Sequence, residues 1–442
     1  MALTVLDISL FVFGHVFTVV GIPLLVKAKE TSLTKFKKLS GSIFAFALFL
    51  TIIIVPLEYI FFQDIISILA PGFDLEKINS SKGIFYYFIF MSAVYLPFFA
   101  LISFFRALNL FSVSNYAEFI VSFISFVYLI VIPKTDVNII PVSLSVGYII
   151  GIFYLIYYAK KVRIIAFYGS LWQKELKVIY INTLKLSLWF LVLQLIRVVD
   201  KSFASLLENG MVISLTYALI ITSGIGFIFD FANVYLTKLS EKTNNNKLIT
   251  KAIKLYITLS IPIIIFLIVY SYGLIKLIYG YGAFDSKAIE VTSKLVAIFS
   301  PLIFLGLINS LFQSLYQSVN KYGYVIFLSF FGVTLNFLLN TYLIESYKVY
   351  GIAIATLFST TIVLFLNIIF LKYKENININ YFELIVYLIK ILIGSYLCYL
   401  SSLILEQFIF KLVVFVVSYI VILILLKDEF IVKIIKLLRG EI

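Results

Sequence analysis

The sequence contains a charged helical face suited to binding a phosphate-bearing ligand. In the apolar stretch 184–206, Arg197, Asp200 and Lys201 are spaced i, i+3 and i+4, so a helix places them on one face. Arginine and lysine bind phosphate oxygens through charge-assisted hydrogen bonds. A carboxylate beside them either sets their charge or binds a cation. Two interpretations stay open: a ligand-binding face in a polar cavity, or an ion pair that neutralises itself near the membrane interface.

Two further cations lie at the ends of apolar stretches. Lys185 opens the stretch that carries Arg197, and Arg106 lies just past the stretch 84–103. Each is a candidate contact for an anionic headgroup inside a cavity. The alternative for both is an interfacial cation whose aliphatic stem lies along apolar surface while its charge reaches water.

Amides recur at helical spacing in two other apolar stretches. Asn309 and Gln313 are one helical turn apart, and Asn336 and Asn340 repeat that spacing further along the chain. A polar stripe of this kind either lines a water-filled path or joins helices by interhelical hydrogen bonds. We take Asn309 and Gln313 as candidate cavity residues.

Two acids within the apolar stretches are candidates for ion coupling. Asp230 falls inside the stretch 212–236, where burial favours the neutral acid unless a cation or basic partner is close. Together with Asp200 it forms the predicted set of Na⁺ or H⁺ coupling sites; a neutral hydrogen-bonded acid is the alternative for Asp230. The chain has one cysteine and one histidine, which disfavours metal clusters and hydrolytic triads. We therefore expect neither an enzyme nor a metal site, and no cofactor apart from the coupling ion.

The composition requires lipid as the surrounding solvent. Of the 442 residues, 62% are hydrophobic and 13% are charged, whereas about a quarter are charged in soluble domains. This apolar surface is too large for one core, since single cores stop growing near ~250 to 300 residues. Backbone groups in hydrocarbon must pair within their own segment, so we predict an all-α polytopic membrane protein. The excess of 13 positive charges lies mostly in loops, so nucleic acid is not an expected partner.

Thirteen apolar runs have about the length of a transmembrane helix. They are 4–26, 42–62, 84–103, 117–132, 139–159, 184–206, 212–236, 254–278, 291–317, 323–344, 350–371, 383–405 and 408–426. Loops after odd-numbered runs, with the C-terminal tail, hold 22 lysines and arginines, against 7 on the other side. Because basic loops stay in the cytoplasm, the C-terminus is predicted to be cytoplasmic and the N-terminus external.

Three short motifs lie in matching loops. They are Leu-Ala-Pro-Gly-Phe-Asp at 69–74, a block spanning 203–210, 215–218 and 236–240, and Tyr-Gly-Ala-Phe-Asp at 281–285. Their content, order and spacing resemble the MurJ/MviN lipid II flippases of the multidrug/oligosaccharidyl-lipid/polysaccharide exporter superfamily. The resemblance covers nearly the whole chain.

The resemblance implies an architecture of two helical lobes around a central cavity. Family members have fourteen helices, and the thirteen runs correspond to helices two to fourteen, so the family's first helix has no counterpart. The implied organisation is an N-lobe at 1–159, a cytoplasmic interfacial linker at 160–183 and a C-lobe at 184–371. Residues 372–442 are then a C-terminal helix pair with a basic tail.

The function implied by the resemblance is flipping of a lipid-linked oligosaccharide or cell-envelope precursor across the cytoplasmic membrane by alternating access. Expected partners are a lipid-linked saccharide diphosphate, membrane lipids and cell-envelope assembly proteins. The Asp-Arg pair that family members usually carry after their Tyr-Ala pair is replaced here by Leu219 and Ile220. A drug or ion antiporter of the same superfamily, and a non-transporting scaffold, therefore stay open as alternatives.

Overall fold

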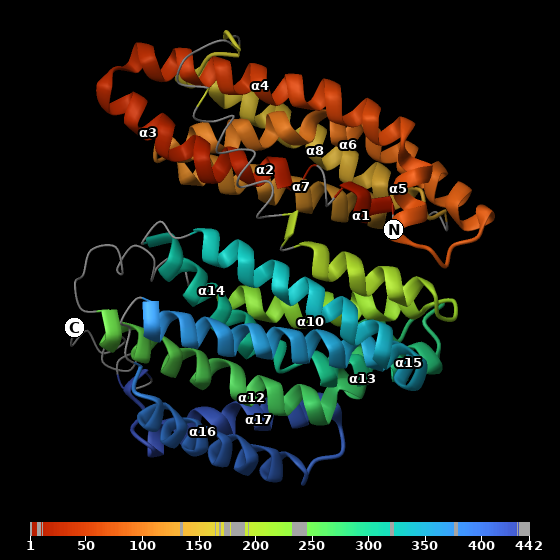
Figure 1. The fold of residues 1–442 in the computed structure, drawn as a ribbon, viewed down its shortest axis with the longest axis vertical. Coiled ribbons are helices and arrows are strands. Elements are labelled where there is room, and N and C mark those ends of the chain that lie inside the picture. The colour runs from red at the N-terminus through yellow and green to blue at the C-terminus, as the bar shows by residue number, and fades with distance from the viewer. Residues whose placement is uncertain are drawn as a thin grey trace. The chain divides into compact units, whose positions relative to one another are not determined.

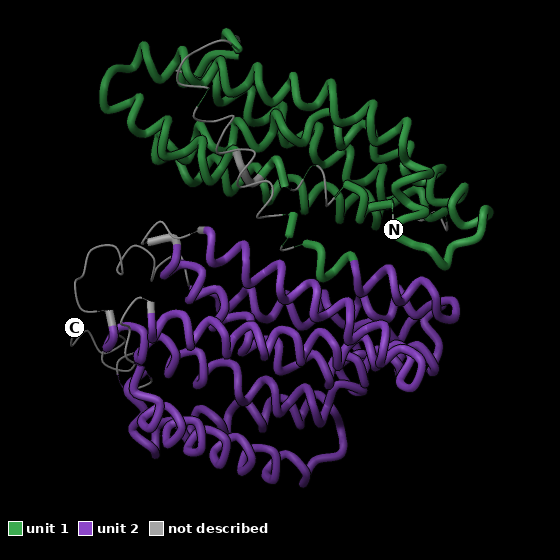
Figure 2. Tube along the Cα trace, in the orientation of Figure 1, with its two compact units in different colours: residues 1–198 green, residues 199–442 purple. Residues whose placement is uncertain are grey.

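The computed structural model of the chain describes most of the predicted membrane region. The described residues are 2–6, 10, 12–132, 136–163, 165–167, 169–171, 177, 191–192, 194–231, 245–318, 322–374, 379–430 and 432. Within these ranges the regular structure is helical and no strand occurs, as the sequence predicts. The chain divides into two compact units, residues 1–198 and 199–442 (Figure 2).

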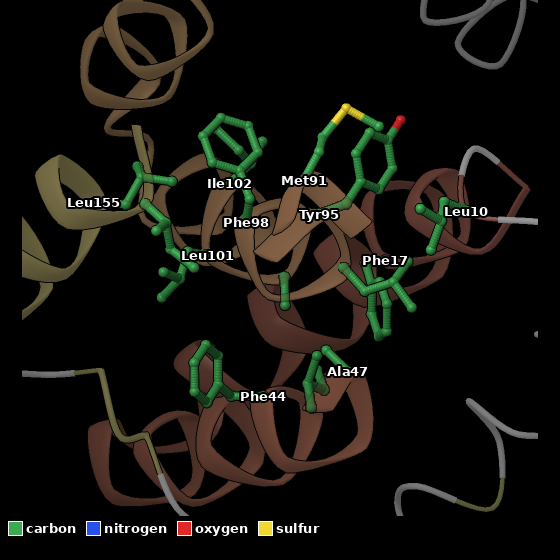
Figure 3. Close-up of a cluster of buried hydrophobic side chains, with 14 of the residues drawn as sticks. Leu10, Phe17, Phe44, Ala47, Met91, Tyr95, Phe98, Leu101, Ile102 and Leu155 are labelled. Atoms are coloured by element: carbon green, nitrogen blue, oxygen red, sulfur yellow. The ribbon is translucent and has the colours of Figure 1, made fainter. Parts of the chain in front are cut away.

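Unit 1 is built around one long central helix, α6. Its helices are α1 (Ala2–Leu6), α2 (Val12–Val16), the π-helix η2 (Phe17–Gly21), α3 (Ile22–Thr31), α4 (Leu33–Ile60), α5 (Phe62–Leu69), α6 (Leu75–Ala107), α7 (Phe111–Val131) and α8 (Ile139–Val162) (Figure 1). Helix α6 packs against most of the others, including α4 and α8. Phe98, Leu101 and Ile102 of α6 are buried in one hydrophobic cluster with Phe44 of α4 and Leu155 of α8 (Figure 3).

Small residues allow α7 and α8 to approach closely. A β-carbon added to Gly147 of α8 would stand 2.5 Å from the Val121 carbonyl oxygen and from Ser125 Oγ on α7. Ser125 Oγ also donates a hydrogen bond to the carbonyl of Ser143 on α8, at 3.1 Å. Helices in lipid gain association energy from such close packing and interhelical hydrogen bonds, because hydrophobic burial contributes little there.

Unit 2 holds the remaining described helices. They are the helical residues 199–205, which continue the helical residues 194–198 of unit 1, α10 (Met211–Ile228), α12 (Asn245–Tyr279), α13 (Ser286–Phe299), α14 (Leu302–Ser318), α15 (Tyr322–Lys374), α16 (Tyr381–Ser402) and α17 (Phe408–Leu425). Helices α16 and α17 pack on each other and on α12. Tyrosines tie this pair to α12: Tyr419 Oη donates to the Thr258 carbonyl at 2.6 Å, and Tyr270 Oη lies 2.8 Å from Ser402 Oγ.

Helix α15 is two helical arms that fold back on each other at Lys348. This residue has φ 50° and ψ −132°, which interrupts the helix. Asn336 and Thr356 lie on opposite arms, yet Asn336 Nδ2 donates to Thr356 Oγ1 at 3.1 Å. Twenty residues of straight helix would separate their Cα atoms by about 30 Å, so this contact requires the arms to be antiparallel. Gly351 permits the tight turn, since a β-carbon there would stand 2.5 Å from the Leu343 carbonyl oxygen.

Two of the sequence motifs end in helix caps. Asp74 precedes α6 and its side chain accepts from Lys77 N at 2.8 Å. Asp285 precedes α13 and accepts from Ala288 N at 2.7 Å, with nearly the same backbone conformation. An aspartate at this position satisfies a backbone N–H group that the helix leaves free. The caps explain why α6 begins at Leu75, nine residues before the predicted apolar run.

The helices have the length and apolarity of membrane spans. Among the described residues, ten helices qualify, or eleven if α13 and α14, bent by 42° at their junction, form one broken span. The span Gly323–Tyr373 combines two predicted runs across Lys348, and the run 184–206 lies partly outside the described residues. The polytopic helical class is confirmed, while the count of thirteen stays a prediction.

The α7–α8 contact can be tested by substituting its glycine. We expect Gly147→Ala to lower the midpoint of thermal unfolding in detergent, because the added methyl group overlaps the Val121 carbonyl. Gly83 of α6 is the matched control, since a β-carbon there would meet nothing within 4 Å. Gly83→Ala should leave the midpoint unchanged or raise it, because alanine is favoured over glycine in a helix by roughly 1 kcal/mol. Equal effects of the two substitutions would contradict the close approach.

Candidate functional site

Two carboxylates in the described part of unit 2, Asp200 and Asp428, are almost fully buried. Asp200 lies in the helical residues 194–205. Its side chain is 1% exposed and meets both arms of α15. Asn336 Nδ2 and Asn340 Nδ2 donate to Oδ1 at 3.1 and 3.0 Å, and Thr356 Oγ1 donates to Oδ2 at 2.7 Å. All three donors are neutral. Hydrogen bonds to a carboxylate favour its ionised form, whereas burial opposes it.

Helix geometry explains how the sequence assembles this site. Asn336 and Asn340 are one turn apart, so they share a face, and Asn340 Nδ2 also donates to Asn336 Oδ1 at 3.1 Å. The turn at Lys348 brings Thr356 of the second arm within hydrogen-bond distance of Asn336 on the first arm. The sequence indicates the amide pair and Asp200. It does not indicate Thr356, because one threonine within an apolar run carries no periodic signal.

The site concentrates oxygen atoms in a buried place. Besides the two carboxylate oxygens of Asp200, it contains Thr356 Oγ1 and the amide oxygens of Asn336 and Asn340. Asn340 Oδ1 is buried and has no hydrogen-bond partner among the described residues. Carboxylate, hydroxyl and amide oxygens are ligands for hard cations. Rotation of the amides, whose nitrogen and oxygen ends are assigned from the hydrogen-bond pattern, would turn further oxygens toward Asp200.

The second predicted coupling acid lies in a different environment. Helix α10 ends at Ile228, earlier than the predicted 236, and Asp230 lies exposed just beyond it. The burial on which its predicted protonation depended is therefore not found. Asp230 Oδ2 accepts from Ser310 Oγ at 2.7 Å, and the neighbouring Asn309 accepts from Asn367 Nδ2 at 3.2 Å. These bonds join α14 to its neighbours. Gln313, one turn on, is half-buried.

The described cationic residues of the predicted set lie in different local environments. Arg106 is paired with Glu118 of α7, its Nη2 lying 3.0 and 3.2 Å from the two carboxylate oxygens. Arg197 is exposed and Lys201 is half-buried, although both are within one turn of Asp200. Lys185 lies outside the described residues, as does the motif 236–240.

Two units that contain helices of membrane-spanning length define a polytopic α-helical membrane protein, and unit 2 contains a buried carboxylate held by polar side chains. The family can be named from the sequence. The family model described as lipid II flippase MurJ matches residues 8–423. The chain therefore belongs to the MurJ family and is a multi-pass inner-membrane protein.

Individual relatives agree with this assignment. A probable lipid II flippase MurJ of Buchnera aphidicola subsp. Baizongia pistaciae (strain Bp) is 28% identical over 338 residues, which are 69% of this chain and 62% of that protein. The match thus spans less than two thirds of the relative. The structure of a lipid II flippase MurJ in an inward closed conformation aligns with a TM-score of 0.79, at 19% identity, over 97% of this chain and 93% of that one.

The same fold extends to a second group of transporters. An inward-facing multidrug resistance transporter of the MATE family, in the MOP superfamily, aligns with a TM-score of 0.63 over 84% of this chain and 88% of that one. A Vibrio cholerae MATE transporter in its bent form aligns with a TM-score of 0.57, over 89% and 87%. Identities of 10% and 15% limit these two comparisons to the fold.

The contribution of the network can be measured at Thr356. Thr356→Val keeps the shape of the side chain but removes the hydroxyl donor to Asp200. We expect a loss of about 1–3 kcal/mol in the free energy of unfolding, because a buried carboxylate loses a partner. Thr361→Val is the control, since the hydrogen bond described for Thr361 is to its own helix, at the Leu357 carbonyl. Thermal unfolding in detergent compares the two, and equal shifts would show that the bond to Asp200 adds nothing.

Proposed function

We propose that the protein moves a lipid-linked saccharide diphosphate across the cytoplasmic membrane by alternating access. The observation that carries the proposal is the match to the lipid II flippase family over residues 8–423. A two-unit helical fold supports it, because alternating access is largely a motion of one helical bundle against the other. Such transport breaks no covalent bond, so polar and cationic contacts to the headgroup are sufficient.

We further propose that Asp200 couples transport to a cation gradient. With the two amides rotated, Na⁺ would meet oxygen atoms of Asp200, Thr356, Asn336 and Asn340, and it would neutralise a carboxylate whose donors among the described residues are neutral. A proton on Asp200 would have the same effect on charge. The exposed Asp230 is the weaker of the two predicted sites, because an exposed carboxylate carries no comparable desolvation penalty.

The headgroup contacts we propose are those with accessible charge or amide groups. Arg197 is exposed next to the Asp200 site, and Asn309 and Gln313 share one face of α14. Arg106 is a poorer candidate, since Glu118 already takes its guanidinium. Lys201 and Lys185 complete the proposed cationic set. We also propose a cytoplasmic C-terminus, with membrane lipids and cell-envelope assembly proteins as partners.

Reconstitution tests the transport proposal directly. In proteoliposomes with a fluorescent lipid-linked oligosaccharide, the purified chain should accelerate transbilayer exchange well above protein-free vesicles, as measured by quenching from outside. Arg197→Ala should slow the exchange, because a charge-assisted bond to phosphate contributes more than a neutral one. Lys77→Ala, a matched cation removal in unit 1, should not. Exchange no faster than in empty vesicles, with or without a Na⁺ gradient, would refute flipping.

Cation binding at Asp200 can be tested without transport. Na⁺ should raise the midpoint temperature of thermal unfolding relative to choline at equal ionic strength. A ligand that binds only the folded state stabilises that state, and at 100 times its Kd it adds about 2.7 kcal/mol to the free energy of unfolding. Asp200→Asn should abolish the rise. Asp285→Asn, which keeps the α13 cap, should preserve it. A rise that choline reproduces, or that survives Asp200→Asn, would exclude Asp200 as a Na⁺ site and leave the proton as the candidate.

A further inference from the structure

A pocket with charged side chains in its lining lies in unit 2, beside the turn of α15. Its volume is about 530 Å³, and its lining includes Leu207, Glu208, Lys287, Lys348 and Tyr350. The residues come from the loop before α10, the first turn of α13 and the turn within α15. The size falls within the range of small-ligand sites. None of the predicted site residues lines this pocket.

The charged residues that line the pocket are two lysines and one glutamate, an excess of one positive charge. Lys287 Nζ lies 3.1 Å from Glu208 Oε2. The pKa of Glu208 is lowered, first by the hydrogen bond and charge of Lys287 and then by the charge of Lys348. Two ammonium groups therefore act on one carboxylate. Such a site attracts an anion, and lysine serves as a compact point charge for phosphate oxygens.

Lys348 occupies a backbone conformation that favours glycine. Its φ of 50° with ψ −132° resembles the first central position of a type II′ turn, where glycine predominates. A side chain with a β-carbon is strained there. Glycine would form the turn with less strain, so forming the turn does not by itself explain a lysine at this position. A function for the ammonium group does explain it.

We propose that this pocket binds the phosphate of an anionic phospholipid headgroup in the external leaflet. Lys348 and Lys287 hold the phosphate oxygens, while Leu207, Val349 and Tyr350 cover the apolar part of the lipid. The leaflet assignment rests on the proposed orientation, in which the loops at 207–211, 279–290 and 345–349 lie outside. The exposed Leu206 beside the pocket favours a ligand that belongs to the membrane surface.

The test is a binding measurement on the full-length protein in detergent. Native mass spectrometry would follow titration with phosphatidylglycerol, and with phosphatidylcholine of the same acyl chains. We expect Lys348→Gly to weaken phosphatidylglycerol binding about tenfold, the effect of losing one charge-assisted hydrogen bond. Lys348→Arg should remain close to wild type. Lys82→Gln, a cation removal on the same predicted membrane face of unit 1, should not change the affinity.

Misfolding cannot imitate this result. Lys348→Gly relieves the strained φ, so its thermal unfolding midpoint should equal or exceed that of the wild type. Unchanged phosphatidylglycerol affinity in Lys348→Gly would overturn the proposal. So would a result in which phosphatidylcholine binds the wild type as tightly as phosphatidylglycerol does and loses the same affinity in Lys348→Gly. If millimolar inorganic phosphate displaced the lipid from the wild type, the site would be one for free anions. Because binding is measured without transport, failure here and failure of flipping are distinguishable.

Discussion

The carboxylate of Asp200 imposes the strictest constraint on unit 2. A charge buried within helices that span a membrane is expensive unless polar groups surround it. Three side chains from two helical arms converge on Asp200, and two of them also bond to each other. A partly satisfied network is less stable than an apolar core. The helical residues 194–205 and the two arms of α15 must therefore pack in one register.

The loops at the predicted external face use one construction in both units. Asp74 and Asp285 each follow a phenylalanine, adopt nearly the same backbone conformation and cap a long or broken span. These motifs carry the resemblance to the family. At both aspartates, however, the side chain accepts a hydrogen bond from a backbone N–H in the first turn of the helix, which is a structural role. A strong motif can thus mark where a helix must begin and leave the functional chemistry to residues elsewhere.

The sequence predicts the fold better than the site, for physical reasons. Lipid forces backbone groups to pair within a segment, so long apolar runs such as 139–159 translate directly into helices such as α8. Asp200, Asn336 and Asn340 are visible as polar residues in apolar runs. Their meeting with Thr356 depends on the turn at Lys348. The gap between the runs 323–344 and 350–371 predicts a break there, but it does not predict which side chains of the two arms meet. The exposure of Asp230 is likewise fixed by where α10 ends, and helix ends are the least predictable feature.

The turn at Lys348 also joins the two polar sites of unit 2. Asn340 and Thr356 lie eight residues before and after it, so each arm extends about 12 Å from the turn to Asp200. One residue more or less in either arm would rotate its side chain by about 100° and remove it from the network. A ligand that holds the backbone at Lys348 therefore stabilises the same register that Asp200 requires. By thermodynamic linkage, occupancy of one site must affect the other to the extent that each distinguishes between conformations of this turn.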